Sequence, residues 1–275
     1  MKKIIVIGCP GSGKSTFSRA LEKVSGIPLF HLDLLYWNAD RTIVEESIFH
    51  QRMFEIIKKD EWIKRTEAFL KEEFSNSEYM SEHSADREYR LQHSYRVANI
   101  GKMIAEKEGF DVVEMVIACL LHDVSYRDEF ATQEDWLNHG RNSARIARTF
   151  LEELCMDESR INDICYGIAI HVDDKADFDG ERTAFAQSIG DADNIDRFDA
   201  YRIYEGLQYC KFSEMTFEEK KEKVTSTLKR LQEYKDMQFG TKTATEIWKK
   251  RILFYIEFYE KLHAQLENST DVIGV

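Results

Sequence analysis

The chain has 275 residues, of which 43% are hydrophobic and 12% aromatic, enough to build one large core or two smaller ones. Its net charge of −12 is spread along the sequence, which argues against a nucleic-acid surface as the main function and leaves metal cations or small anionic substrates as candidates. Five cysteines without a CxxC pair, and no apolar run near the roughly 18 residues of a membrane span, predict a reduced, cytoplasmic protein.

The first 63 residues alternate between strand patterns and helix patterns. Strands are predicted over residues 2–8, 27–33 and 61–63, and helices over 14–25 and 44–60. This βαβαβ order predicts a small parallel sheet. Beyond about Arg65 the sequence lacks proline and has a helical pattern throughout. We therefore expect a mainly α protein with a small α/β module over residues 1–63 and a helical domain over residues 64–275.

The segment "GCPGSGKS", Gly8 to Ser15, fits the phosphate-loop pattern G-x-x-x-x-G-K-[ST] between a predicted strand and a predicted helix. In such a loop backbone N–H groups surround phosphate oxygens, Lys14 neutralises the outer phosphates and Ser15 offers a hydroxyl to Mg²⁺. The expected ligand is Mg-ATP or another nucleotide. Its expected binding residues are Gly8, Gly11, Ser12, Gly13, Lys14, Ser15 and Thr16.

Through "IGCPGSGKSTFSRAL", "IPLFHLDLLYW" and "KKDEWI", these 63 residues resemble the start of adenylate-kinase-like P-loop proteins often labelled DNA topology modulation proteins. The resemblance implies a kinase ancestry with Asp33 near the acceptor site, although Asp33 equally fits a loop residue or a helix cap. The further strands, magnesium-binding acid and arginine-bearing lid of such kinases are not evident here. We therefore expect nucleotide binding without phosphoryl transfer.

The run Val112 to Leu121 is apolar except for Glu114 and ends at His122 and Asp123. Its length and helical neighbours favour a central buried helix over a strand. Core-facing positions in four other helical patterns are occupied by His93, His139, His171 and Asp193. Any one of these histidines alone would fit an ordinary core residue, but a buried carboxylate needs compensation for its charge. One shared metal centre explains the whole set.

The order H…HD…H…H…D resembles the HD-domain phosphohydrolase superfamily, supported by "HSYRVA", "ACLLHDV", "HGRNSARIA" and "DADNIDRF" and covering about residues 65–266. The resemblance implies an all-helical fold and a divalent metal held by His93, His122, Asp123 and Asp193. In two-metal members, positions matching His139 and His171 hold a second ion that Asp123 bridges. Nitrogen and carboxylate ligands without thiolate favour Mn, Fe, Co or Ni. Asp191 competes with Asp193 as the ligand in "DAD", and helical phase favours Asp193.

The expected function is a metal-dependent phosphohydrolase that uses a metal-activated hydroxide on a nucleotide or another small phosphoester or phosphoanhydride. The catalytic candidates are Asp123 and Arg96. Arg96 could bind a phosphate or form only a surface salt bridge. Asp173 and Asp174, just after His171, are read as an acidic loop. Two alternatives stay open: a P-loop kinase or NTPase with a regulatory helical domain, and a non-catalytic nucleotide sensor. The expected partner is a small phosphorylated substrate such as a nucleotide. Nucleic acid is not expected as the main partner, no membrane is expected, and a homodimer is left open.

Overall fold

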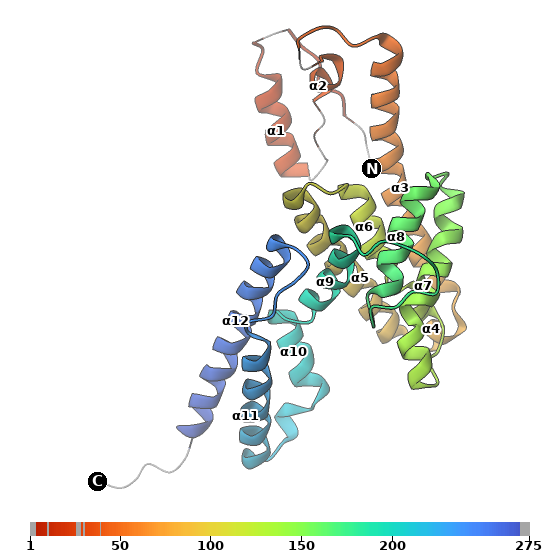
Figure 1. Cartoon of the computed structure of the whole chain (residues 1–275). Coiled ribbons are helices and arrows are strands. Elements are labelled where there is room, and N and C mark those ends of the chain that lie inside the picture. The colour runs from red at the N-terminus through yellow and green to blue at the C-terminus, as the bar shows by residue number, and fades with distance from the viewer. Residues whose placement is uncertain (1–3, 10, 26–28, 30, 39, 270–275) are drawn as a thin grey trace. The chain divides into compact units, whose positions relative to one another are not determined.

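The computed structural model describes residues 4–9, 11–25, 29, 31–38 and 40–269, with the side chains of residues 51, 55–57 and 60 left aside. The chain divides into two compact units, an N-terminal unit, Met1–Lys59, and a helical unit, Asp60–Val275 (Figure 1). The bounds of helix α3, Glu46–Asn76, span the division between the units. Each unit is described by itself below.

Within its described residues the N-terminal unit contains helices α1, Lys14–Ser25, and α2, Leu32–Tyr36, and the start of α3. The helix predicted over 14–25 is confirmed. The predicted parallel sheet is absent from the described residues, where the extended pairing is an isolated bridge between Trp37 and Ile43. Residues 4–9 form no strand, and residues 2, 3, 27, 28 and 30 of the predicted strands lie outside the described part. A strand requires a neighbour for its backbone hydrogen bonds, and an apolar run alone does not supply one.

The third predicted strand, residues 61–63, is wrong, because this segment lies inside α3. Trp62, Thr66, Leu70 and Phe74 recur every four residues and are all buried in the helical unit. The Trp62 indole also donates a hydrogen bond to the Leu154 carbonyl at 3.1 Å. A period of four places these side chains on one helical face, so burial of that face favours the helix over an extended segment.

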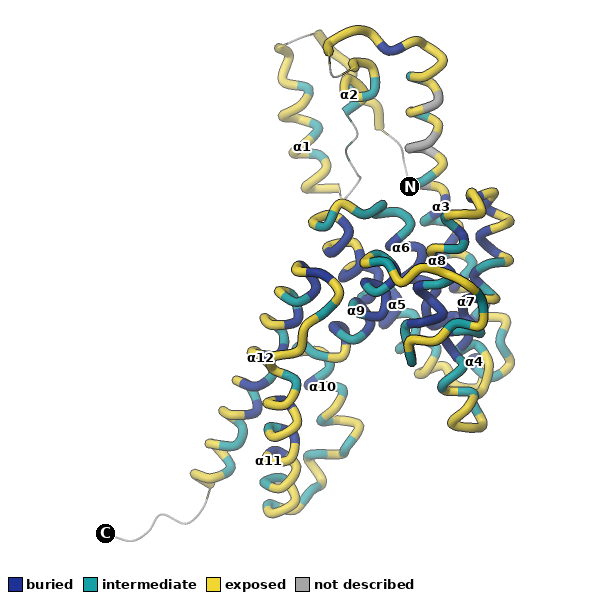
Figure 2. Tube along the Cα trace, viewed as in Figure 1, coloured by how far each residue is buried: buried dark blue, intermediate teal, exposed yellow. Residues whose placement is uncertain are grey.

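The N-terminal unit buries little apolar surface. Ile5, Ile7 and Val24 are 75%, 88% and 88% exposed, and Val44 is its one buried hydrophobic residue among those described. The tube in Figure 2 is accordingly exposed along most of this unit. The described residues of this unit therefore form no core of their own. They lack most of the apolar burial that is the main favourable contribution to folding.

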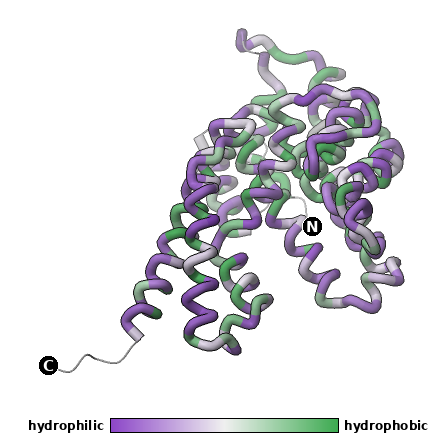
Figure 3. The backbone as a smooth tube through the Cα atoms, turned by 60° about the horizontal axis from the view of Figure 1, so that its bottom comes forward, coloured by the Kyte–Doolittle hydropathy of each residue, from purple (hydrophilic) through white to green (hydrophobic). Residues whose placement is uncertain are grey.

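The helical unit continues from α3 as a succession of helices around one core. Its elements are α4, Glu78–Glu82; α5, Ser84–Glu108; α6, Val112–Leu121; the 3₁₀ helix η1, Val124–Arg127; α7, Gln133–Glu153; α8, Glu158–Ile170; α9, Ala184–Asp196; α10, Ala200–Tyr209; the 3₁₀ helix η2, Phe212–Glu214; α11, Phe217–Tyr234; and α12, Lys242–Glu267. In Figure 3 the helix leading to the C-terminus alternates hydrophilic and hydrophobic stretches, as one-sided packing requires. No described helix is long and apolar enough to cross a membrane.

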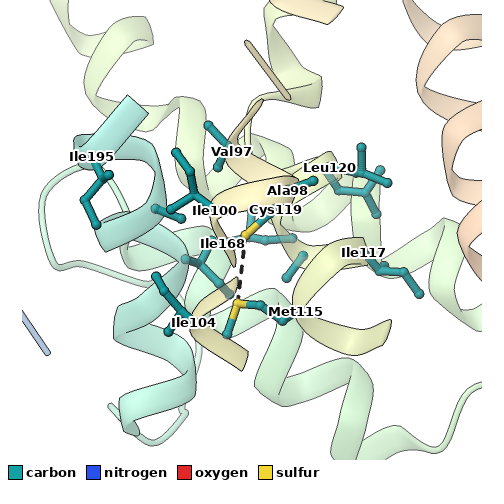
Figure 4. Packing of buried hydrophobic residues seen from close by; sticks show 14 of the residues in the cluster. Val97, Ala98, Ile100, Ile104, Met115, Ile117, Cys119, Leu120, Ile168 and Ile195 are labelled. Carbon is teal, nitrogen blue, oxygen red and sulfur yellow. Dashed lines mark hydrogen bonds between the residues drawn. The ribbon is translucent and has the colours of Figure 1, made fainter. Parts of the chain in front are cut away.

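Helix α6 is the central buried helix, as its apolar run predicts. The Asp111 side chain caps its start by accepting hydrogen bonds from the amides of Val113 and Glu114. Helices α5, α8 and α9 all contact α6. Figure 4 shows residues from these helices packed around Cys119 and Met115.

The approach of α5 to α6 depends on Gly101 of α5. A Cβ at Gly101 would lie 2.5 Å from the Cys119 sulfur and 3.1 Å from Met115 Cγ. A larger residue would therefore push the two helices apart. Helix α6 ends at Leu121 and η1 begins at Val124, so His122 and Asp123 lie at the junction of two elements, inside the core.

Candidate metal centre

The structure brings together all six residues that helical phase placed on core-facing positions. They come from five places in the helical unit: α5, the α6–η1 junction, α7, the residue after α8, and α9. The side chains are at most 6% exposed. The six residues are His93, His122, Asp123, His139, His171 and Asp193. Such a concentration of imidazoles and carboxylates in a core requires mutual compensation.

Each of the four imidazoles is oriented by a hydrogen bond from its Nδ1 atom. His122 donates to the Cys119 carbonyl and His171 to the Ile168 carbonyl, both at 2.7 Å, and His139 donates to the Trp136 carbonyl. A carbonyl oxygen can only accept, so the proton of these three rings lies on Nδ1. The fourth ring, that of His93, contacts the Asp196 carboxylate through Nδ1 at 2.8 Å. This arrangement leaves all four Nε2 atoms directed at the centre, as in histidines that bind a metal.

The Nε2 atoms divide between the two oxygens of Asp123. Asp123 Oδ2 lies 3.5 Å from His93 Nε2 and 3.6 Å from His122 Nε2. Asp123 Oδ1 lies 3.3 Å from His139 Nε2 and 3.5 Å from His171 Nε2. One carboxylate therefore faces two separate pairs of nitrogens, which is the arrangement of a bridging ligand.

Asp193 joins the first of these pairs. Its Oδ1 atom lies 3.1 Å from His93 Nε2 and 3.8 Å from His122 Nε2. Three overlapping sets of three residues are close enough to hold an ion: His93, His122 and Asp123; His122, His171 and Asp193; and Asp123, His139 and His171. All the donors in these sets are imidazole nitrogens or carboxylate oxygens, which are groups that bind divalent metals.

Two observations indicate that protein contacts alone do not satisfy the centre. His122 Nε2 is buried and has no hydrogen-bond partner among the described residues. His139 Nε2 and His171 Nε2 lie 3.2 Å apart, although the protons of both rings are on Nδ1. Two lone pairs at that distance repel unless a cation or a proton lies between them. The residues present thus fit a metal ion.

The electrostatic environment also suits a cation. Burial lowers the pKa of His122 to about 4, which keeps this imidazole neutral and able to coordinate. Burial also lowers the pKa of His93, but hydrogen bonds to Asp193 and Asp196 outweigh burial and raise this pKa to about 9. For Asp123 and Asp193 burial raises the pKa, and neighbouring histidines and arginines outweigh it, so both carboxyl pKa values are lowered. Both acids are therefore carboxylates, the form that binds metal.

Arg96 is connected to the centre through Asp196. Its Nε and Nη2 atoms donate to the two oxygens of Asp196 at 2.9 and 3.2 Å, and its guanidinium lies over the Tyr201 ring. Asp196 in turn holds His93. The role that these contacts support for Arg96 is to position Asp196, and they leave the predicted phosphate contact without support.

Sequence reasoning missed Arg90, Asp196 and Arg197. Arg90 Nη1 lies 3.0 Å from Asp123 Oδ2, and Arg197 Nη2 lies 2.7 Å from Asp193 Oδ2. Helical spacing carried a signal for all three. Arg90 precedes His93 by three residues, and Asp196 and Arg197 follow Asp193 by three and four, so each lies on the same helical face as a predicted ligand.

A cavity of 760 Å³ adjoins the centre. Its lining includes Arg90 and Arg197, which contact Asp123 and Asp193, and Tyr126, whose ring lies 5.1 Å from that of His139. The Arg90 guanidinium stacks 3.3 Å above the Tyr126 ring. Five tyrosines, three arginines and three carboxylates line the cavity in all. Its size is that of a pocket for a small molecule.

The other acids of this region are engaged elsewhere. Asp191 Oδ2 accepts a hydrogen bond from the Gly240 amide at 2.8 Å and lines a separate cavity of 360 Å³. The structure therefore places Asp193, and not Asp191, among the six residues. Asp173 pairs with Arg141 and Asp174 with Arg182, each at 2.7 Å.

The predicted phosphate loop belongs to the N-terminal unit. The structure describes all of its residues except Pro10. Gly11 and Gly13 have φ angles of 80° and 81°, the left-handed region that glycine adopts readily. Lys14 begins α1 and donates from Nζ to the Cys9 carbonyl at 2.8 Å. Gly8, Ser12, Ser15 and Thr16 are exposed. Asp33 lies in the first turn of α2, whose N-cap residue is His31. Nucleotide binding by this loop stays a prediction.

Comparison with known proteins bears on the helical unit. The HD domain model matches residues 90–198, a range that contains all six residues of the centre. The match does not reach residues 1–63, and the resemblance of that segment to adenylate-kinase-like proteins is not supported. No curated protein is significantly similar to the chain.

A solved structure agrees with this match in fold. The crystal structure of a predicted HD superfamily hydrolase from an uncultured Thermotogales bacterium superposes with a TM-score of 0.51 at 20% identity. The similarity covers 74% of this chain and 91% of that chain. At this identity the similarity concerns the fold. The segment that the HD domain model matches, residues 90–198, thus contains the six converging side chains, and the solved structure shares the fold.

Proposed function

We propose that the chain is a metal-dependent phosphohydrolase that acts on a nucleotide or another small phosphoester or phosphoanhydride. The observation that carries the proposal is the buried Nε2 atom of His122, which has no hydrogen-bond partner among the described residues and faces carboxylate oxygens of Asp123 and Asp193. An HD domain at residues 90–198 supports the same conclusion.

Two ions are proposed, each held by one group of donors. His93, His122 and Asp193 would hold the first ion and His139 and His171 the second, with one Asp123 oxygen toward each. Bound divalent metals would supply Lewis-acid polarisation of a phosphate and a lowered pKa for water at the centre. The separation of the two Asp123 oxygens between the two histidine pairs favours two ions over one.

The chain's own residues have two roles around such ions. Arg90 and Arg197 each bind one metal-ligand carboxylate and also line the adjoining cavity. They orient Asp123 and Asp193 and add positive charge where a phosphate would approach. The Arg197 side chain is half-exposed, so N–H groups remain accessible to a substrate anion.

The rest of the cavity supports a substrate with a planar ring. Tyr89 and Tyr126 line it beside the centre, and four further aromatic residues, Tyr79, Phe130, Tyr209 and Tyr255, line it elsewhere. Aromatic faces stack on nucleobases with little sequence preference. A nucleotide is therefore the substrate class that combines a phosphate for the centre with a ring for the tyrosines.

A P-loop kinase or NTPase remains the second candidate. The observation in its favour is the pair of left-handed glycines, Gly11 and Gly13, directly before the helix that Lys14 begins. Such a turn can direct backbone amides at a phosphate. In this candidate the HD domain would regulate the N-terminal unit.

The deciding experiment combines metal analysis with phosphate release. The purified full-length chain is analysed for metal and then assayed with Mn²⁺ on nucleotides and a small phosphate monoester. We expect bound transition metal and hydrolysis that is lost in Asp123→Asn but retained in Lys14→Ala. Turnover of nucleoside triphosphate that depends on Lys14 and survives Asp123→Asn would instead establish the second candidate.

A further inference from the structure

A second cavity, of 540 Å³, lies next to the cavity at the metal centre. The two share three lining residues, Arg197, Arg202 and Tyr255. The second cavity extends toward α11 and α12, where Arg230 and Trp248 line it. A molecule bound beside the centre could therefore reach into the second cavity past Arg202.

The second cavity differs from the first in charge. The first is lined by three arginines and three carboxylates, which balance one another. The described residues that line the second include Arg197, Arg202 and Arg230 and no aspartate or glutamate. Among the described residues neither Arg202 nor Arg230 forms an ion pair with a carboxylate. Arg202 donates to the Tyr89 hydroxyl, a neutral group that leaves its charge uncompensated.

The walls of the second cavity are aromatic and largely held in place. Trp248 is 2% exposed, donates from its indole to the Tyr234 carbonyl at 3.2 Å, and packs edge-on against Phe198. Phe239 lies against the same indole. A low-polarity wall strengthens the attraction between a guanidinium and an anion, because less water screens the charges. The combination of uncompensated arginines and aromatic walls favours an anionic group over a cation or a neutral one.

We infer that the second cavity binds a second phosphate of the same substrate. The inference rests on the proposed function, in which a first phosphate occupies the metal centre beside Arg90. The substrate class is then a nucleotide with phosphates at both ends of the nucleoside, with its base and sugar against the tyrosines of the first cavity. Arg202 and Arg230 bind the distal phosphate, each able to offer paired N–H donors to its oxygens.

The test compares three ligands of one nucleoside: the 5′-monophosphate, the 5′-diphosphate and the 3′,5′-bisphosphate. The diphosphate carries the same number of phosphates as the bisphosphate but at one end only. Binding of hydrolysis-resistant phosphonate analogues of the three ligands to the full-length chain, with its metal bound, is measured by titration calorimetry, so that hydrolysis does not enter. We expect the bisphosphate to bind about tenfold more tightly than either of the others, the equivalent of one added charge-assisted contact.

Arg230 is the residue to change, because it contacts no residue of the metal centre. Arg230→Ala should remove the advantage of the bisphosphate, and Arg230→Lys should retain part of it. The matched control is Lys229→Ala, which removes the same charge from the neighbouring exposed position of α11 outside the cavity lining. The advantage should be unchanged in that variant. Equal binding of the three ligands, tighter binding of the diphosphate, or an advantage that survives Arg230→Ala would each overturn the inference.

Hydrolysis assays with Mn²⁺ separate the two proposals. If the bisphosphate advantage is present and depends on Arg230, but no phosphate is released from any nucleotide, the phosphohydrolase proposal fails and the second phosphate site stands as a binding site. If monophosphates are hydrolysed and no bisphosphate advantage exists, the proposed function stands and the second phosphate site is rejected.

Discussion

The two units of this protein differ in what they contain: one has a continuous sequence motif and little buried core, and the other has a site of dispersed residues held by a core. The N-terminal unit carries a complete phosphate-loop pattern from Gly8 to Ser15, yet many of its described large apolar side chains, such as Ile7, are exposed. In the helical unit the residues of the centre are dispersed along the sequence from His93 to Asp193, yet the core brings all six within reach of one another. A motif specifies local chemistry, whereas a site built from distant residues requires a core to hold it.

The largest expected effect comes from Asp123, the residue that faces both histidine pairs. Asp123→Asn keeps the shape of the side chain but removes its charge, so we expect loss of metal from both positions. Hydrolysis should fall by more than about 100-fold, because removing a group that only orients a metal ligand already lowers activity by up to about 100-fold. Metal content is measured by elemental analysis and activity by phosphate release.

Asp191→Asn is the matched control for that variant. It removes a carboxylate from α9 that bonds to Gly240 rather than facing the imidazoles. Metal content should be unchanged in this control. Full metal occupancy in Asp123→Asn would contradict the metal-centre assignment.

Because the two units differ in packing, we expect replacement of a large apolar side chain by alanine to lower the free energy of unfolding by different amounts in each. Leu151→Ala in the core of the helical unit should lower the free energy of unfolding by about 2 to 5 kcal/mol, because Leu151 is fully buried. Ile7→Ala, at a position 88% exposed, should change it by less than about 0.5 kcal/mol. Denaturant unfolding measures both. A large loss for Ile7→Ala would show that this side chain is packed in the folded protein.

The second histidine pair tests the division of the centre into two positions. Replacing His139 and His171 together by alanine should reduce the metal content from two equivalents to one and leave the position around His93 and His122 filled. The readout is metal stoichiometry after equilibrium dialysis. Unchanged stoichiometry and activity would identify these two histidines as ordinary core residues.

The supporting residues should have smaller effects. Asp196→Asn weakens the contact that orients His93 and also removes the charge that Arg96 binds. We expect metal affinity to fall by about 10- to 100-fold, as for other groups that orient a ligand. Competition with a chelator of known affinity measures this change. Unaltered affinity would mean that packing alone orients the His93 ring.

The smallest effect on hydrolysis is expected from the phosphate loop. Lys14→Ala should weaken nucleotide binding to the N-terminal unit and leave metal-dependent hydrolysis of a small phosphate monoester unchanged. Calorimetry and phosphate release measure the two properties in the same preparation. Transfer of phosphate from ATP to an acceptor, dependent on Lys14, would make the P-loop kinase the first candidate function and the phosphohydrolase the second.

The helical part of the fold and the six residues of the centre could be predicted from the sequence. The apolar run from Val112 predicts α6, and the phases of His93, His139, His171 and Asp193 place each on a core-facing position. Both are properties of a local period, which the chain carries without knowledge of its neighbours. The sheet was not accessible in the same way, because apolar runs such as residues 4–7 predict a strand only if another strand lies beside them.

By itself, then, the sequence determined which faces of the helices are apolar and which metal-binding side chains lie on those faces. Only the tertiary structure decided that Asp123 directs one oxygen to each histidine pair, that Asp196 holds His93, and that Arg197 and Arg202 line two adjoining cavities. The reason is physical: periodicity depends on the backbone of one helix. Distances between side chains on different helices depend instead on how every residue of the core packs.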